Sequence, residues 1–374
     1  MSKKDDNKLG MPPMPKGDVV SKEMDEPAQM MVAEDIVPQG TDLISEQVED
    51  KNLCLVIDVA KREKRGEDAP PLAYSNRHVI AVGVFDGMGG SGATEYATPN
   101  GSHTGAYLAS RHVKNACLQF VSSLEKCFVD TTDLSRIIKE DLDKCISTYN
   151  IKPSGLRSAL IRILPTTLAM LCAEKEGKQT HVFSYWCGDS RNYILSKNGL
   201  HQVSIDHLST PQDPLENLRN DESLSNCICQ DKPFSIEVYD CGAFSEPVIL
   251  LSATDGCFGY LKSPMHFEYL LLGALEESKD REEWQARIES KLKEISGDDF
   301  SLSLKATEGD FDYWKKCLRS RFKYINETYI EPIRSLERSV NDAKHQVEIA
   351  QTDLYDTITS LWENYKQDFM PIIK

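Results

Sequence analysis

The sequence predicts an α+β domain, in which β-sheets pack together with helices outside them, followed by a helical C-terminal appendage. Two observations carry this expectation. Short apolar runs with β-branched or aromatic residues occur near the start and again in the middle, and stretches with helical periodicity follow each group. The chain has 374 residues, which is enough for one large domain with an appendage.

The apolar runs predict strands with at least one buried face, at Leu53–Val59, Val79–Phe85, Thr167–Ala173, Val182–Cys187 and Val248–Ser252. Two further strands are expected at Tyr193–Ser196 and Phe300–Leu304. Helical spacing predicts helices at Thr104–Phe128, Leu134–Tyr149, His266–Glu276 and Arg281–Ile295. The charged segment Lys61–Asn76, which contains two prolines, is expected to be an exposed loop.

The chain divides into three predicted regions. Residues 1–38 are rich in Pro, Met and charged residues without periodicity, which is typical of a mobile tail. Residues 39–307 hold the predicted strands and helices. In residues 308–374, apolar side chains recur at steps averaging about 3.6, the period of one helix face, and Pro332 should kink this helix or begin a second one. Because that face must be covered, we expect the extension to pack on the domain, to pair in a dimer or to dock a partner.

Composition excludes several classes of protein. A net charge of -16 argues against nucleic-acid binding, whose affinity comes from Lys and Arg meeting phosphates. The N-terminus is polar, unlike a signal peptide, and no apolar run approaches the roughly 18 residues of a membrane span. The eleven cysteines are scattered without a C-x-x-C pair, so we interpret them as reduced thiols of a cytoplasmic protein.

Four short motifs place an aspartate beside a turn or at the end of a predicted strand. They are Asp86-Gly87, Gly188-Asp189, Asp255-Gly256 and Asp298-Asp299. Taken alone, each is explained at least as well by an ordinary turn. Taken together they are more specific, because clustered carboxylates repel one another unless a cation lies between them.

Carboxylate and carbonyl oxygens select Mg²⁺ or Mn²⁺ over softer metals. Two such ions about 3.5–4 Å apart can share a bridging water, lower its pKa and hold a phosphoryl group. The four motifs therefore indicate this chemistry if the fold brings them together.

The motifs, in this order, resemble those of the type 2C metal-dependent Ser/Thr phosphatases, and the Asp-Gly-Met-Gly-Gly run at Asp86 is similar to the bacterial branch. The resemblance extends from about Gly40 to Ala306. Supporting matches are Glu49-Asp50, Thr166-Thr167-Leu168 and Asp206-His207.

The resemblance implies a sandwich of two antiparallel sheets flanked by helices, in four layers, and two bound Mg²⁺ or Mn²⁺ ions. By the same resemblance, Asp86 would bridge both ions and Gly87 would offer its carbonyl to one of them. Asp255 and Asp298 would complete the protein ligands of the other ion.

Three further acids are assigned by the resemblance. Glu49 and Asp50 would hold waters bound to the ions. Asp189, together with Asp255, matches the pair that binds a third, weaker ion in bacterial members.

Two positions depart from the family pattern. Many relatives carry an Arg shortly before the Glu-Asp pair, where this chain has Ser45, so another cation such as Lys51 or Arg77 would have to grip the phosphate. Met88 stands where animal members have a His, and a thioether cannot donate a proton to the leaving group.

The function expected from this resemblance is hydrolysis of phosphoserine or phosphothreonine in proteins, by a water or hydroxide that bridges the ions. The partners would be phosphorylated proteins, a Ser/Thr kinase among them, with no nucleic acid and no membrane. Two alternatives stay open: a scaffold that keeps the fold without turnover, and a phosphatase acting on a small phosphorylated metabolite.

Overall fold

The computed structural model describes residues 52–63, 65–127, 130–151, 161–210, 213–220 and 222–369, all of which belong to the unit Gly40–Lys374. The expected tail at residues 1–38 lies outside the described residues, and so do Ser45, Glu49, Asp50 and Lys51.

Two five-stranded antiparallel sheets form a sandwich, which confirms the predicted fold class. One sheet, in spatial order, contains β1 (Cys54–Val59), β12 (Phe300–Ala306), β11 (Ile249–Ala253), β8 (Arg191–Ser196) and β9 (Gly199–Gln202). The other contains β10 (Glu237–Phe244), β7 (Gln179–Cys187), β6 (Leu168–Glu176), β3 (Val79–Val84) and β2 (Leu72–Ser75). A separate hairpin is formed by β4 (Glu95–Thr98) and β5 (Gly101–Thr104).

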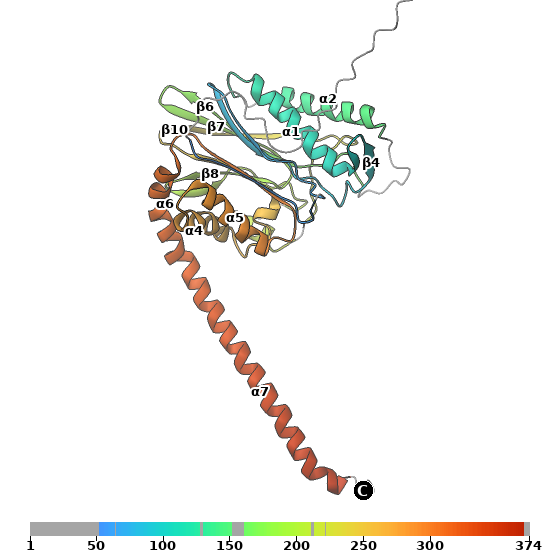
Figure 1. Ribbon diagram of the computed structural model, residues 1–374, viewed down its shortest axis with the longest axis vertical. Helices are drawn as coiled ribbons and strands as arrows, with labels where there is room; N and C mark the ends of the chain where they lie inside the picture. The colour runs from blue at the N-terminus through green and yellow to red at the C-terminus, as the bar shows by residue number, and fades with distance from the viewer. Residues whose placement is uncertain are drawn as a thin grey trace, which may run out of the picture. The chain divides into compact units, whose positions relative to one another are not determined.

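Helices cover both outer faces of the sandwich (Figure 1). The β10–β2 sheet is covered by α1 (Gly105–Ser123) and α2 (Thr132–Tyr149), and the β1–β9 sheet by α4 (Pro264–Glu277), α5 (Arg281–Ile295) and α6 (Phe311–Ile325). Short turns occur at α3 (Pro214–Asn217) and η1 (Asp255–Cys257). None of the helices among the described residues is long and apolar enough to cross a membrane.

The core has three layers, as this architecture requires. Val82 and Leu250 are buried between the sheets, Phe120 and Tyr185 between one sheet and its helices, and Trp284 between the other sheet and its helices. Every residue of β3 is buried because the strand has a covered layer on each face. For this reason its sequence is a continuous apolar run rather than an alternating one.

The C-terminal helices continue through a π-helical turn. The segment η2 (Asn326–Ile330) precedes α7 (Glu331–Phe369), and Pro332 is the second residue of α7. A proline removes one N–H from the helical ladder, and a wide turn accommodates its ring. Before this turn, α6 belongs to the domain core, because Trp314 and Leu318 are fully buried beside α4.

Candidate metal centre

Several strand ends meet at one end of the sandwich. Val84, the last residue of β3, pairs with Ala169 near the start of β6, and Ala253, the last residue of β11, pairs with Leu302 near the start of β12. The turn from β7 to β8 crosses between the two sheets at this same end. The four aspartate motifs flank these strand ends, so the fold brings together Asp86, Asp189, Asp255 and Asp298.

The Asp86-Gly87 pair is fixed by its neighbours on both sides. The backbone carbonyl of Asp86 accepts hydrogen bonds from the Thr166 hydroxyl at 2.6 Å and from the Thr167 N–H at 2.8 Å. A Cβ added at Gly87 would lie 2.4 Å from the carbonyl oxygen of Glu67. Glycine is therefore needed here so that the Glu67 backbone can lie against the Asp86 turn.

The Asp255-Gly256 pair is built in the same way. A Cβ at Gly256 would lie 1.9 Å from the Asp299 carbonyl oxygen, so that segment packs directly on the turn. The Asp299 carboxylate accepts the N–H groups of Lys61 and Glu67, both at 2.7 Å. These bonds tie the segment before β12 to the segment before β2.

Asp298, the predicted ligand of this pair, is exposed, and its carboxylate accepts the N–H of Asp299 at 2.9 Å. Burial raises the pKa of Asp255, and the negative charge of Asp298 raises it further. The Asp299 carboxylate accepts two backbone N–H groups from the segment before β2, whereas that of Asp298 accepts the N–H of Asp299 itself.

Asp189 lies in the turn between β7 and β8. Gly188 has a φ of 110°, a conformation that favours glycine, and the Ser190 hydroxyl lies 2.7 Å from that of Thr167. Burial, together with the negative charges of Asp255 and Asp206, raises the pKa of Asp189 to about 7.

The same repulsion acts on the other acids. Burial raises the pKa of Asp86 well above its usual range, and the charges of Asp68, Asp255 and Asp189 raise it further. The carboxyl groups of Asp86 and Asp255 are within hydrogen-bond reach of each other. Carboxylates held this close without a compensating cation are costly, and a divalent ion among them would reverse the effect.

The donor set fits hard divalent cations. The groups at this end of the sandwich are carboxylate and backbone oxygens, the ligands that Mg²⁺ and Mn²⁺ prefer. Among the described residues, no three of these aspartates bring their oxygens within 4.8 Å of one another. Ions of this class bind proteins through one or two carboxylates and keep several of their waters.

Sequence reasoning missed Glu67 and Asp68, because the exposed loop predicted at Lys61–Asn76 was wrong in its second half, where Asp68 and Ala69 are buried and β2 follows. Asp68 is buried, and its carboxylate accepts a hydrogen bond from the Thr254 hydroxyl at 3.1 Å. Burial and the negative charges of Asp299 and Asp255 raise its pKa well above the usual range. The available signal was a second Glu-Asp pair, nearer to the Asp86 motif than Glu49-Asp50 is.

The cations near the site also differ from those suggested by the sequence. Arg77 precedes β3 and Asp86 follows it. Because β3 has six residues, its two ends are about 20 Å apart, and Arg77 lies at the end away from the acids. In contrast, Arg62 and Arg65 are exposed on the segment that Asp299 holds beside the acids. Arg111 of α1 donates to the Glu67 carbonyl at 3.3 Å and so helps to hold this segment in place.

Two other polar residues have structural contacts. The Arg191 guanidinium donates to both carboxylate oxygens of Asp206, at 2.9 and 2.6 Å, and both side chains are buried. His207 Nδ1 accepts the N–H of Gly188 at 3.1 Å. Both residues therefore support the turn that carries Asp189.

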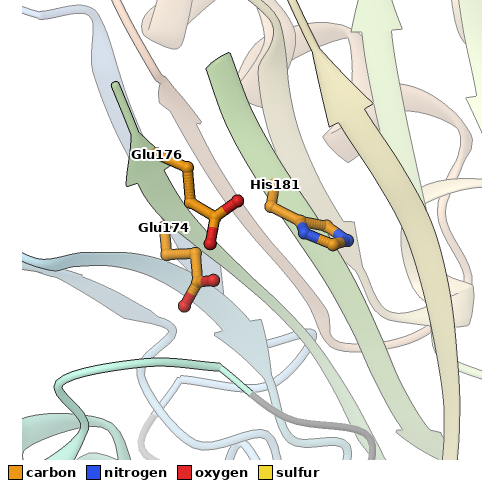
Figure 2. Close-up of side chains that lie close together, drawn as sticks. All are labelled: Glu174, Glu176 and His181. Atoms are coloured by element: carbon orange, nitrogen blue, oxygen red, sulfur yellow. The ribbon is translucent and has the colours of Figure 1, made fainter. Parts of the chain in front are cut away.

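A second polar cluster lies elsewhere, on the β6–β7 hairpin (Figure 2). Glu174, Glu176 and His181 each bring one ligand atom within 4.8 Å of the others. Glu174 already accepts the N–H of Cys127 at 2.6 Å, and His181 Nε2 lies 2.6 Å from an Asp240 oxygen. Since two of the three members are engaged by the protein itself, we assign this cluster no metal.

Comparison with known proteins identifies structures of similar fold. No protein-family model matches the chain, and no curated protein matches its sequence. A sex-determining protein of C. elegans is similar at 16% identity with a TM-score of 0.51, covering 72% of this chain and 68% of that one.

Two bacterial proteins match with lower scores. The serine/threonine phosphatase Stp1 of Staphylococcus aureus has 16% identity and a TM-score of 0.46, covering 71% of this chain and 100% of its own. The serine/threonine phosphatase PstP/Ppp of Mycobacterium tuberculosis has 14% identity and a TM-score of 0.45, covering 68% and 97%. At these identities the likeness concerns the fold alone.

Proposed function

We propose that this chain is a metal-dependent phosphatase acting on phosphoserine or phosphothreonine in proteins. The observation that carries the proposal is the gathering of Asp68, Asp86, Asp189 and Asp255 at one end of the sandwich, where burial raises the pKa of all four and the charge of Asp255 further raises that of the other three. A fold that holds four acids together at this cost is expected to use them on a cation. The type 2C resemblance of the motifs supports the same reaction.

When bound, two Mg²⁺ or Mn²⁺ ions would supply an activated water and neutralise the phosphoryl charge. Asp86 and the Gly87 carbonyl would hold them from one sheet, and Asp255 with Asp298 from the other. Asp68, which already accepts a hydroxyl hydrogen bond, is placed to accept hydrogen bonds from waters on the ions. With Asp189, the set would also hold a third, weaker ion.

For phosphate binding we assign Arg62 and Arg65 in place of the Arg of the family pattern, for which the Glu49-Asp50 match gave Ser45. With Glu67-Asp68 as the Glu-Asp pair, these two residues precede it closely, where the family carries its Arg. The Asp299 hydrogen bonds fix the backbone of this segment at both ends. A guanidinium here can grip a phosphate with two hydrogen bonds.

The test is turnover of p-nitrophenyl phosphate with Mn²⁺, comparing the wild type with Asp255→Asn. Activity that needs the metal and is lost in the folded variant separates an enzyme from a scaffold. A phosphopeptide compared with small phosphoesters then separates a protein phosphatase from one that acts on metabolites. Absence of turnover on every phosphoester, with Mn²⁺ bound, would favour the scaffold.

We also propose a reducing compartment, the cytoplasm, for this protein. All eleven cysteines lie among the described residues, and all are free thiols. In a secreted protein with this many cysteines, disulfides would be expected. Quantifying free thiols in protein denatured under alkylating conditions tests this, and fewer than eleven would contradict it.

A further inference from the structure

The helix α7 carries an apolar stripe that is open to solvent. Its larger members are exposed, with Val347 at 56%, Leu354 at 61% and Leu361 at 62%. The helix is 39 residues long. Its contacts with the domain, among those described, are at its start, where Arg334 donates to the Tyr269 hydroxyl at 2.9 Å and Glu337 pairs with Lys262. The domain therefore does not cover the stripe beyond this point.

The stripe repeats every seven residues. Over two helical turns this is 3.5 residues per turn, slightly fewer than the 3.6 of a straight helix. One set of positions is Ile333, Val340, Val347, Leu354 and Leu361, and the second set is Leu336, Ala343, Ala350 and Thr357. A sustained seven-residue repeat of this kind makes a helix supercoil with another helix. From Ile333 to Leu361 the repeat spans about 42 Å.

We propose that a second copy of this chain covers the stripe, with the two α7 helices antiparallel and their two-fold axis between Val347 and Ala350. In this register Val347 faces Ala350 of the second copy, Leu354 faces Ala343, and Val340 faces Thr357. The layers around the two-fold axis each pair a larger side chain with a smaller one and so have similar volumes, and the layer beyond them pairs Leu361 with Leu336 of the second copy. The stripe is complementary to itself when reversed, as a two-fold dimer requires.

Charge along the edges of the stripe agrees with this pairing. In the antiparallel register Lys344 faces Gln351 of the second copy, and Gln346 faces Asp353. Ser339 faces Ser360 in the same way. No like charges meet across these pairs, and most charged residues of α7 lie on its outer positions.

A parallel dimer would fit less well. It would place Ala343 against Ala343 and Ala350 against Ala350, with Val347 against Val347 between them. Two narrow layers would then alternate with wider ones, leaving space that side chains do not fill. The sequence of α7 therefore favours the antiparallel orientation of the two helices, and this orientation can be tested separately from dimer formation.

The first experiment is sedimentation equilibrium of the full chain over a range of micromolar concentrations. We expect a dimer for the wild type. A double variant, Val347→Glu with Leu354→Glu, should be monomeric, with the dissociation constant of the dimer raised at least a hundredfold. The matched control, Thr352→Glu with Thr359→Glu, adds the same charges to exposed outer positions and should remain dimeric. A monomeric wild type, or a dimer that the first variant does not disrupt, would overturn the proposal.

The second experiment tests orientation with a short bismaleimide cross-linker, using the wild type to measure the reaction of native cysteines. α7 contains no cysteine. In the antiparallel dimer, Leu336→Cys and Leu361→Cys chains should cross-link when mixed, since the two positions face each other. Either variant alone should not, because its own copies are about 37 Å apart. Efficient cross-linking of Leu336→Cys with itself would show a parallel dimer and overturn the assigned register.

Discussion

Replacing Asp189 by Asn should stabilise the metal-free protein at neutral pH. Burial and neighbouring carboxylates raise the pKa of Asp189 from 3.8 to about 7, and each unit corresponds to 1.36 kcal/mol, so ionising this group in the folded state costs about 4 kcal/mol. Asn has nearly the same shape without the charge. Because the side chain is partly exposed and solvent screens part of this cost, we expect a gain of about 1–3 kcal/mol.

The gain should depend on pH with a defined sign. Between about pH 4 and pH 7 the folded wild type holds a proton on Asp189 that the unfolded chain has released. The contribution of this group to wild-type stability is therefore full below about pH 4 and is lost as pH rises through 7. Asp189→Asn lacks this loss, so its advantage should be largest at pH 7.5 and less than half as large at pH 5.

Urea unfolding in EDTA at these two pH values measures the effect, with Asp342→Asn on the exposed surface of α7 as a control expected to change little. Saturating Mn²⁺ should reduce or reverse the order at pH 7.5, since the wild type binds the ion better. If Asp189→Asn is no more stable than the wild type in EDTA at pH 7.5, the acids do not repel one another as described. The inference of a cation site from their gathering would then be refuted.

Three further changes test the site. Asp255→Asn should fold but lose at least about a hundredfold in turnover, or about 2.7 kcal/mol of transition-state stabilisation. Mn²⁺ should also raise its melting temperature less than that of the wild type, and near-normal kinetics would contradict a ligand role. Gly256→Ala should destabilise by about 1–3 kcal/mol, because its Cβ would lie 1.9 Å from a backbone oxygen, whereas Gly90→Ala, with open space around it, should be near neutral in urea unfolding. Alanine at both Arg62 and Arg65 should raise KM for a small phosphoester about tenfold with little change in kcat, and an unchanged KM would assign phosphate binding elsewhere.

The sequence predicted those strands whose burial is visible locally. β3 and β11 are buried throughout, so their apolar runs are continuous and easy to recognise. β10 was not predicted, because it lies at the edge of its sheet, alternates irregularly between exposed and half-buried residues, and has a register shift between Asp240 and Gly242. Its strand conformation depends on pairing with β7, which the local sequence does not express.

For the site, too, the sequence predicted the residues whose local pattern is recognisable and missed one whose environment comes from distant segments. Asp86, Asp189 and Asp255 follow recognisable strands, and a sandwich in which these strands end together gathers them. Asp68 was not predicted, because the charged residues and prolines around it indicate an exposed loop, although Glu67-Asp68 is a Glu-Asp pair before the Asp86 motif. Its burial comes from Thr254, 186 residues away. Residues whose environment is supplied by such distant segments look exposed until the fold is known.

The two sheets are joined at the site by backbone contacts, not only by the acids themselves. Gly87 lets the segment before β2 lie on the turn after β3, within one sheet, and Gly256 does the same for the segment before β12 in the other sheet. Asp299 then connects the sheets, because its carboxylate holds the amides of Lys61 and Glu67. The acids therefore cannot separate to relieve their repulsion without breaking these contacts. This restraint keeps the carboxylates close in the absence of an ion, and it makes the cation, once bound, a stabiliser of the whole sandwich end.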